Sequence, residues 1–368
     1  MRVVIAGGGT GGHLFPGIAL AEEVMTRAPN RHDVLFIGTA RGLEAKVIPQ
    51  HGYKLELIQV SGLKRVGLVK FLKSVFLLPA ALLRSIQILH SYRPDVVVGV
   101  GGYASGPVVL AAWLMRVPTA IQEQNAFPGL TNRLLGRFAD HVFTAFPEAL
   151  RHFPKQKVQL LGNPIRRQLL DNYLVSSVPH EKFRLLVFGG SQGAHVLNQA
   201  MIEAIPYLES VKEKLHIIHQ TGELELELVR EGYAKAGASA EVVDFIRDMS
   251  SAYARADAIV CRAGATTLSE LAVAKKAAVL VPFAAAADNH QELNARSLVD
   301  AGAAVMLLER ELSGERLAKE IFALMNPERR RQMAKAAGGL GRPEAAKEIA
   351  DVLVEVSHKR WGKHWRST

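Results

Sequence analysis

The chain has 368 residues, of which 49% are apolar and 22% charged, and its 45 Lys and Arg against 35 Asp and Glu give a formal net charge of +10. These values exclude a disordered chain, and the length exceeds what one hydrophobic core usually serves, so we expect two domains. The single Cys261 excludes an internal disulfide and a cysteine-based metal site, and a reducing compartment fits best. The positive charge favours an anionic partner: nucleic acid, an acidic membrane surface or a phosphorylated small molecule.

The N-terminus is predicted to form a β-strand over residues 2–6, because it runs directly into glycines without the long apolar stretch of a signal peptide. Gly7 to Gly12 follow this strand and precede a helical pattern, so backbone N–H groups converge where an anion would bind. The loop also matches G-x-G-x-x-G, but the second strand ends at Thr39 without the acidic residue of a dinucleotide site. The chain's glycine loops also lack the Gly-Lys-Ser/Thr ending of a P-loop, so neither nicotinamide binding nor ATP hydrolysis is expected.

The chain repeats one plan, because residues 2–13 are echoed by 184–195 and residues 93–102 by 255–264. In both halves, short β-branched runs alternate with longer helical patterns. The further expected strands are 34–37, 96–100, 119–121, 215–218, 258–261 and 278–281. Near-continuous apolar strands separated by helices indicate parallel sheets covered on both faces, so the predicted fold is two doubly wound α/β domains.

The boundary between the halves is expected at residues 161–165, which are followed by a polar stretch. Residues 343–359 have helical periodicity, and we expect this helix to return across the boundary. The predicted domains are 1–163, 164–340 and a C-terminal helix and tail at 341–368. A cleft between two such domains is the default place for a ligand.

Two loops of the second half are suited to a diphosphate, because residues 189–193 open one helix and residues 262–270 open another. The hydroxyls and the cation available at these helix N-termini belong to Ser191, Thr266, Thr267 and Arg262. Glu270 lies where a carboxylate could take both hydroxyls of a ribose; the alternative is an acid that complements the helix dipole. No D-x-D occurs in the chain, so no metal site for a nucleotide is expected.

Several segments, in this order, carry a resemblance to a known family. They are 7–16, 101–107, 123–126 with 129–132, 162–166, 189–194, 261–270, 288–291 with 294–295, and 341–346. The chain resembles glycosyltransferase family 28, and within it the bacterial enzymes that extend a lipid-linked muramoyl acceptor in peptidoglycan synthesis. The resemblance implies a GT-B fold, with two Rossmann-like domains facing a cleft, UDP-N-acetylglucosamine at the C-terminal domain and the acceptor at the N-terminal one.

The resemblance also implies the reaction. N-acetylglucosamine would move, with inversion, to the muramoyl 4-hydroxyl of undecaprenyl-diphospho-muramoyl-pentapeptide (lipid I), giving lipid II and UDP with no cofactor required. Such a transfer needs a base for the acceptor proton and a cradle for the departing UDP. His13 is the candidate base, and the alternative is that it only hydrogen-bonds the acceptor phosphate. Asn125 is the second candidate at the reaction centre.

Further site residues follow from the resemblance, residue by residue. Donor-binding candidates are Thr10, Gly11, Gly12, Asn125, Arg166, Ser191, Ile246 through its backbone, Arg262, Glu270 at the ribose and Gln291 at the sugar. Acceptor-side candidates are Gly102, Tyr103 and Glu123, with the alternative that Glu123 and Asn132 only order their loop. The chain departs from some relatives in carrying four alanines at 284–287, which puts the local loop contacts in doubt.

A lipid-linked acceptor requires the enzyme to approach a membrane, and residues 64–84 combine cations with apolar side chains. The expected membrane contacts are Lys64, Arg65, Lys70, Phe71, Lys73 and Phe76; the alternative is a core helix with a solvated basic end. The longest apolar runs are too short to span a bilayer, so we expect a peripheral protein on the cytoplasmic face of the inner membrane. Residues 358–368 hold two of the three Trp among cations and form a second candidate contact, or else a frayed tail.

Three other functions fit the sequence less well: an epimerase, a membrane scaffold and a nucleic-acid binder. A UDP-sugar epimerase on the same architecture would need no lipid-facing surface. A non-catalytic membrane scaffold leaves His13 and the paired glycine loops without a reason. A nucleic-acid binder fits the charge, but the sequence has no RNP-like motif, helix-turn-helix signature or zinc spacing, so no nucleic-acid partner is expected. A complex of cell-wall synthesis or division remains open as a protein partner.

Overall fold

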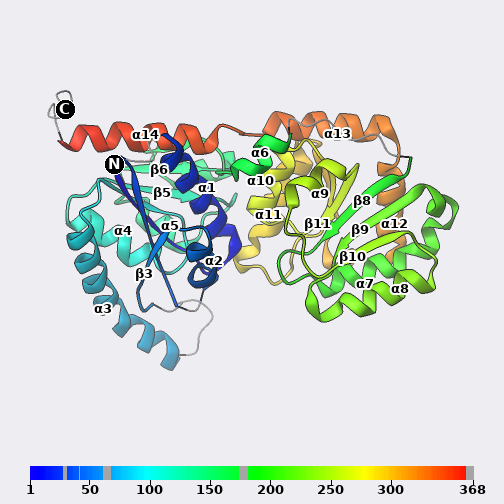
Figure 1. Ribbon diagram of the computed structural model, residues 1–368, viewed down its shortest axis with the longest axis horizontal. Helices are drawn as coiled ribbons and strands as arrows, with labels where there is room; N and C mark the ends of the chain where they lie inside the picture. Colours follow the sequence, from blue (N-terminus) through cyan, green and yellow to red (C-terminus); the bar gives the residue numbers. More distant parts are fainter. Residues whose placement is uncertain (28–30, 41, 61–67, 174–180, 362–368) are drawn as a thin grey trace. The chain divides into compact units, whose positions relative to one another are not determined.

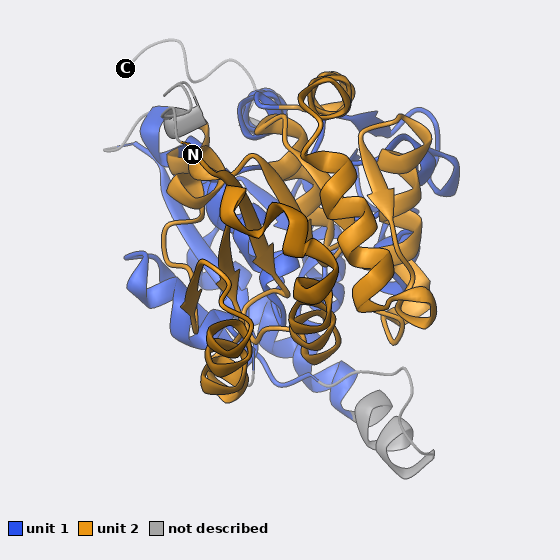
Figure 2. Cartoon of the chain, turned by 90° about the vertical axis from the view of Figure 1, so that its right-hand side faces the viewer, with its two compact units in different colours: residues 1–167, 343–368 blue, residues 168–342 orange. Residues whose placement is uncertain are grey.

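The computed structural model describes residues 1–27, 31–40, 42–60, 68–173 and 181–361, with side chains described except at 68–76, 171–173 and 359–361. The chain forms two compact units (Figure 2): unit 1 comprises residues 1–167 and 343–368, and unit 2 comprises residues 168–342. Within the described residues, no helix is both long and apolar enough to cross a membrane.

Unit 1 is built on a seven-stranded parallel sheet in the order β3-β2-β1-β4-β5-β6-β7. The strands are β1 (Arg2–Ala6), β2 (Asp33–Gly38), β3 (Lys54–Leu57), β4 (Val96–Gly99), β5 (Thr119–Glu123), β6 (His141–Thr144) and β7 (Val158–Leu160). Because every strand runs the same way, the loops that follow β1, β2, β4 and β5 all lie at the carboxyl edge of the sheet.

Helices cover both faces of this sheet (Figure 1). They are α1 (Gly11–Arg27), α2 (Glu44–Gln50), α3 (Leu68–Tyr92), α4 (Ser105–Leu114), α5 (Leu130–Leu135), the 3-10 turn η1 (Pro147–His152) and α14 (Ala345–Trp361). Val3 and Val4, which point to opposite faces, belong to different cores. The core on the Val3 side includes α1 and α14, and the core on the Val4 side includes α3, α4 and α5.

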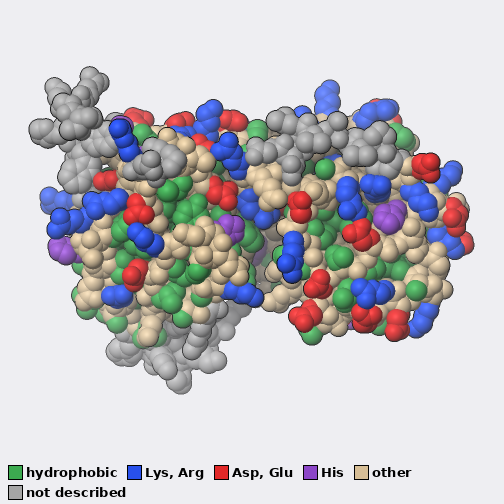
Figure 3. All heavy atoms as spheres, viewed as in Figure 1, with side chains coloured by type: hydrophobic (Ala, Val, Ile, Leu, Met, Phe, Trp, Pro, Cys, Tyr) green, Lys and Arg blue, Asp and Glu red, His purple; other side chains and the backbone are tan. Residues whose placement is uncertain are grey.

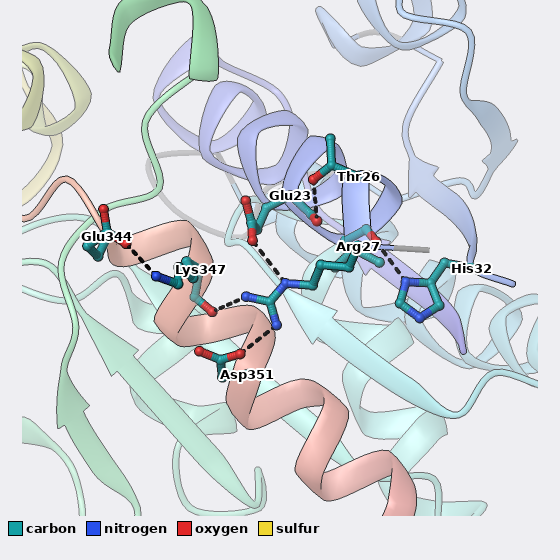
Figure 4. A network of polar contacts seen from close by, with 8 residues as sticks. Glu23, Thr26, Arg27, His32, Glu344, Lys347 and Asp351 are labelled. Carbon is teal, nitrogen blue, oxygen red and sulfur yellow. Dashed lines mark hydrogen bonds and ion pairs between the residues drawn. The ribbon is translucent and has the colours of Figure 1, made fainter. Parts of the chain in front are cut away.

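Helix α14 packs on α1, although more than 300 residues separate them in the chain (Figure 4). Arg27 joins them: its Nη1 pairs with Asp351 Oδ1 at 2.6 Å, its Nη2 donates to the carbonyl of Lys347 at 2.8 Å, and its Nε donates to Glu23 at 2.9 Å. Ile349 and Leu353 of α14 are buried against the sheet. The last helix is therefore part of the first unit's core.

Unit 2 repeats the plan with six parallel strands in the order β10-β9-β8-β11-β12-β13. The strands are β8 (Phe183–Phe188), β9 (Leu215–Gln220), β10 (Ala240–Val243), β11 (Ala258–Cys261), β12 (Ala277–Leu280) and β13 (Ala304–Met306). The α-helices are α6 (Arg167–Tyr173), α7 (His195–Ala204), α8 (Leu226–Lys235), α9 (Met249–Arg255), α10 (Ala265–Val273), α11 (His290–Asp300), α12 (Gly314–Leu324) and α13 (Pro327–Leu340). The 3-10 turns are η2 (Ile205–Lys214), η3 (Glu223–Glu225), η4 (Ala287–Asn289) and η5 (Glu309–Glu311). The predicted fold, two doubly wound parallel-sheet domains, is confirmed.

Candidate active site

The first glycine loop, Gly7–Gly12, joins β1 to α1 and lies against the loop that follows β4. Gly8 has φ +136°, a region that other residues rarely adopt. A Cβ atom on Gly102 would lie only 2.3 Å from the carbonyl oxygen of Gly8. The two loops can approach this closely because position 102 is glycine.

A buried carboxylate supports the other side of this loop. Glu44, at the start of α2, is 1% exposed; its Oε2 accepts from the backbone N–H of Gly9 at 2.7 Å. Its Oε1 accepts from both the backbone N–H and the hydroxyl of Thr39, at 2.9 and 2.8 Å. A Cβ atom on Gly42 would lie 2.0 Å from Glu44 Oε2, and Gly8 and Gly38 are similarly close. Sequence reasoning missed Glu44, because its partners come from three separate segments.

The candidate base His13 lies in the first turn of α1 and is half-buried. Its Nδ1 is 3.2 Å from Thr10 Oγ1, and its backbone N–H donates to the carbonyl of Thr10 at 3.2 Å. The imidazole also lies beside Gly101, since a Cβ atom there would be 2.6 Å from its Cδ2. The structure thus brings Thr10, His13 and the loop after β4 together.

Glu123, at the end of β5, is 1% exposed and is surrounded by donors from its own loop. It accepts from the backbone N–H of Asn125 at 2.9 Å, that of Gly129 at 3.2 Å, and the side-chain amides of Asn125 at 3.2 Å and Asn132 at 2.9 Å. Burial raises the pKa of Glu123, while these four donors favour the carboxylate. Glu123 therefore organises the 123–132 loop and positions Asn125.

Two other predicted residues flank this edge of unit 1. Tyr103, beside Gly102, is 56% exposed, which leaves its ring accessible to a ligand. The Arg166 guanidinium lies 4.9 Å from the centre of the Phe15 ring, so it is held against α1. The structure gathers Thr10, Gly11, Gly12, His13, Gly102, Tyr103, Glu123, Asn125 and Arg166 into unit 1.

The second glycine loop, Gly189–Gly193, joins β8 to α7 in unit 2. Gly193 has φ +74°, and a Cβ atom on it would lie 1.8 Å from the carbonyl oxygen of Thr221. The side-chain amide of Gln220 donates to the carbonyl of Gly190 at 2.6 Å. The loop after β9 thus holds the turn that carries Ser191, whose side chain is exposed.

A chain of polar side chains runs from this loop into the core. His195, the first residue of α7, pairs with Glu225, which also accepts from the Asn198 amide at 2.6 Å. Asn198 Oδ1 accepts from His219 Nε2 at 3.1 Å, and Tyr233 donates to His219 Nδ1 at 2.7 Å. Burial lowers the pKa of His219 to about 3, so this imidazole stays neutral in the folded unit.

Glu270, the ribose candidate, lies within α10 and is 6% exposed. The hydroxyl of Tyr253 donates to Glu270 Oε2 at 3.0 Å, which orients the carboxylate. Burial, and to a smaller extent the charge of Glu270, raises the pKa of the Cys261 thiol, so this thiol is not a nucleophile. Tyr253 is a second residue that sequence reasoning missed.

Arg262, the cation expected to meet the diphosphate, is already paired in this structure. Its Nη1 lies 2.5 Å from Glu309 Oε1 and donates to the carbonyls of Val281 at 3.2 Å and Pro282 at 3.3 Å. Gln291 Oε1 accepts from the backbone N–H of Phe283 at 3.0 Å. Unit 2 holds the donor candidates Ser191, Ile246, Arg262, Glu270 and Gln291; Ile246 is half-buried within a mostly exposed segment before α9.

The remaining expectations concern the membrane and metals. Lys64 and Arg65 lie outside the described residues, as do the side chains of Lys70, Phe71, Lys73 and Phe76 in α3 and the tail beyond residue 361. On the face drawn in Figure 3, Lys and Arg are spread over both units and interspersed with Asp and Glu. Within the described part of the chain, no three His, Cys, Asp or Glu residues group in a way that would hold a metal ion.

Two parallel-sheet units, each with a glycine loop after its central strand, define a two-domain α/β protein of the GT-B class. The N-terminal domain model of glycosyltransferase family 28 matches residues 3–144, and the C-terminal domain model of that family matches residues 184–351. The chain belongs to glycosyltransferase family 28, as its motifs predicted, and is a glycosyltransferase.

Similar proteins span the whole chain. A protein of Anaeromyxobacter sp. (strain Fw109-5) is 63% identical over 363 residues, covering 98% of this chain and 95% of that protein. A protein of Myxococcus xanthus (strain DK1622) is 62% identical over 367 residues, covering 100% and 96%. Both are named UDP-N-acetylglucosamine--N-acetylmuramyl-(pentapeptide) pyrophosphoryl-undecaprenol N-acetylglucosamine transferase.

Solved structures agree on the fold. The crystal structure of Acinetobacter baumannii MurG is 33% identical, with a TM-score of 0.79 over 96% of this chain and 99% of that one. A UDP-N-acetylglucosamine 2-epimerase structure matches with a TM-score of 0.64 at 15% identity, which shows a shared fold alone. The epimerase architecture is therefore not evidence of epimerase activity here.

Proposed function

We propose that the chain transfers N-acetylglucosamine from UDP-N-acetylglucosamine to the muramoyl 4-hydroxyl of lipid I, with inversion, and releases lipid II and UDP. The observation that carries this proposal is the 62–63% identity, along the whole chain, to proteins named for that transfer. The chemistry of the site residues is consistent with this transfer.

Unit 2 binds the donor. The helix N-termini of α7 and α10 supply backbone N–H groups and positive dipole ends for the diphosphate, with Ser191 contributing a hydroxyl. Glu270, oriented by Tyr253, accepts the two ribose hydroxyls. Ile246 contacts the uracil through its backbone, and Gln291 contacts the sugar. No cofactor takes part, since helix dipoles and hydrogen bonds stabilise the departing UDP.

Unit 1 binds the acceptor and supplies the base. His13 takes the proton of the muramoyl 4-hydroxyl as the oxygen attacks the anomeric carbon, because an imidazole is the side chain best suited to proton transfer near neutral pH. Thr10 Oγ1, 3.2 Å from His13 Nδ1, orients the ring. Asn125, fixed by Glu123, hydrogen-bonds the sugars, and Gly102 and Tyr103 line the acceptor side.

The protein works at the cytoplasmic face of the inner membrane and binds it peripherally through the first part of α3. Apolar side chains are also exposed on the helices of this unit: Leu83 of α3 is 62% exposed, and Trp113 and Leu114 at the end of α4 are 41% and 52% exposed. The Trp113 ring packs 5.1 Å from that of Phe138, which is also exposed. Exposed tryptophan and leucine side chains are suited to a lipid interface.

Transfer of radiolabelled N-acetylglucosamine from its UDP conjugate to a lipid I analogue tests the reaction, with EDTA present to test metal independence. We expect lipid-linked product from the native chain and a loss of at least 100-fold in Glu270→Ala. Native protein that binds the donor but makes no product would contradict the proposal. Incubating UDP-N-acetylglucosamine alone tests the epimerase alternative, which requires a C2-epimerised nucleotide sugar to accumulate without acceptor.

A separate experiment tests the membrane side. We expect Lys70→Glu with Lys73→Glu to reduce co-sedimentation with phosphatidylglycerol vesicles several-fold, while the double variant stays unbound to phosphatidylcholine vesicles as the native chain does. Deletion of residues 358–368 tests the contribution of the tail to vesicle binding separately from that of α3. Unchanged vesicle binding after this deletion would remove the tail as a membrane contact.

A further inference from the structure

Three side chains from three different loops hold the turn that follows β12. Arg262, after β11, donates to the carbonyls of Val281 and Pro282. Gln291 of α11 accepts from the backbone N–H of Phe283 at 3.0 Å, and Glu309 of η5 accepts from that of Ala284 at 3.3 Å. Strands β11, β12 and β13 are neighbours in the sheet, so these loops meet at its carboxyl edge.

Glu309 joins two parts of this arrangement. One carboxylate oxygen pairs with Arg262 Nη1 at 2.5 Å, and the other accepts from Ala284 N. The side chains of Arg262 and Glu309 are only 11% and 18% exposed, so solvent and salt screen their attraction little. The Arg262 guanidinium also lies 5.4 Å from the centre of the Phe283 ring. Glu309 thus fixes the guanidinium and the turn relative to each other.

These contacts are compatible with the alanine at position 284. The turn is held through backbone N–H and carbonyl groups of residues 281–284, which do not depend on the side chain at position 284. An alanine at position 284 therefore keeps all of these backbone contacts.

We propose that Glu309 is a positioning residue for the donor and sets the affinity for the nucleotide sugar, an inference that rests on the proposed function. Arg262 and Gln291 are donor candidates, and Glu309 holds the first directly and the second through the shared turn. Without its carboxylate, Arg262 would lose its counter-charge and Ala284 N its acceptor, so both candidates would leave their present positions. Glu309 acts through these groups and need not touch the donor.

Equilibrium binding of UDP-N-acetylglucosamine and steady-state transfer by the full-length chain test this role. We expect Glu309→Ala to raise the Kd and the KM for the donor at least ten-fold, while the KM for the lipid I analogue changes less than two-fold. Glu309→Gln keeps an oxygen for Ala284 N but not the charge, so its donor Kd should rise about three-fold. Glu311→Ala is the matched control, because Glu311 lies in the same turn, is more exposed and pairs with Arg316.

A double-mutant cycle shows whether Glu309 works through Arg262. The double variant Arg262→Ala with Glu309→Ala should bind the donor about as weakly as the worse single variant, since both changes remove the same pair. A merely structural role would instead lower the melting temperature and affect both substrates.

The outcomes separate two failures. A native chain that does not bind the donor overturns the proposed function and this inference with it. A native chain that binds, together with Glu309→Gln that melts as the native chain does and binds within two-fold, overturns the inference alone, even where Glu309→Ala does not fold. Tighter binding in Glu309→Gln also overturns it, because Glu309 would then compete with the donor for Arg262.

Discussion

On the side of the first glycine loop that faces β2, the neighbouring group is the carboxylate of Glu44, with Gly38 and Gly42 making room for it. The equivalent neighbour of the second glycine loop, after β9, is the backbone of Thr221 and Gly222. Strands β1 and β8 occupy equivalent places in their sheets, and the two loop sequences are alike. Unit 1 therefore uses a charged side chain where unit 2 uses close backbone packing.

The difference teaches that a glycine pattern specifies a turn but not the charge around it. The Gly9 amide is already engaged by a carboxylate that lies 35 residues further along the chain, so a fixed negative charge lies beside the first loop. The second loop is instead held by the backbone of Thr221 and Gly222 and by the neutral side chain of Gln220. This difference supports the proposal that the second loop takes the diphosphate of the donor in unit 2.

The largest expected effect comes from removing the backbone contact in unit 2. Gly193→Ala would place a Cβ atom 1.8 Å from the Thr221 carbonyl oxygen, and neither backbone can yield cheaply. We expect a loss of about 4 kcal/mol in the free energy of unfolding, measured by urea denaturation. Gly190→Ala is the control: nothing lies within 4 Å of a Cβ there, so only the strain of φ +97° remains, roughly 1–2 kcal/mol. Equal losses in both variants would contradict the comparison.

Removing the carboxylate from unit 1 should cost slightly less. Glu44→Ala deprives the Gly9 and Thr39 N–H groups and the Thr39 hydroxyl of their acceptor, and we expect a loss of about 3 kcal/mol together with a raised KM for the acceptor. Glu56→Ala, which removes an exposed carboxylate paired with Arg84, should change stability by less than about 0.5 kcal/mol. Urea unfolding and transfer kinetics measure both; a loss confined to donor binding would argue against a link between Glu44 and the first loop.

Acid should weaken unit 2 through His219. The folded-state pKa of about 3 is below the unfolded value of 6.5, so below pH 6.5 the unfolded chain binds a proton that the folded unit does not. Stability is therefore complete above pH 6.5 and falls as pH drops towards 3, by about 2 kcal/mol at pH 5. His219→Gln should flatten this dependence in urea unfolding at pH 7 and pH 5. The exposed His51 of unit 1 is the control position. If the unfolding free energy of His219→Gln still fell between pH 7 and pH 5 as it does in the native chain, His219 would not be the cause.

The smallest effect sharpens the description of the first loop. Thr39→Val removes the hydroxyl that donates to Glu44 at 2.8 Å but keeps the backbone N–H that donates at 2.9 Å, so about 1 kcal/mol should be lost. Thr26→Val removes an exposed hydroxyl that bonds the carbonyl of Glu23 on α1 and should cost less. Thermal denaturation measures the stability of both variants. A larger loss of stability in Thr26→Val than in Thr39→Val would contradict this prediction.

Much of the fold followed from the sequence because buried parallel strands leave continuous apolar runs. Residues 258–261 were predicted as a strand and form β11 without change, and residues 119–121 form the first part of the longer β5. Strands β3, β6, β7, β10 and β13 were not predicted. All five are short, and β3, β7 and β10 are also partly exposed and carry Lys54, Gln159 and Glu241. Tertiary pairing at or next to the sheet margins, rather than local pattern, makes them strands.

The site residues also fall into a predicted group and a group that was not predicted. Residues in glycine loops or next to them were predicted because their sequence context is distinctive, as for His13 and Ser191. Glu44, Tyr253 and Glu309 were not, because each lies in ordinary helical or turn sequence and acts through a partner from another segment. Gly38 and Gly42 were the one indication of Glu44 in the sequence: they leave room for a buried side chain but do not identify it.

Helix α14, bound to α1 through Arg27, gives the protein an unusual order of assembly during synthesis. Unit 2 is continuous in the chain, so it can complete its core as soon as residue 342 has left the ribosome. Unit 1 begins first but lacks Ile349, Ala350 and Leu353 until α14 emerges, and one of its two cores stays open until then. The unit whose first strand is synthesised earlier is thus the unit that completes its core last, and nascent chains stalled before residue 345 would expose the apolar surface of α1.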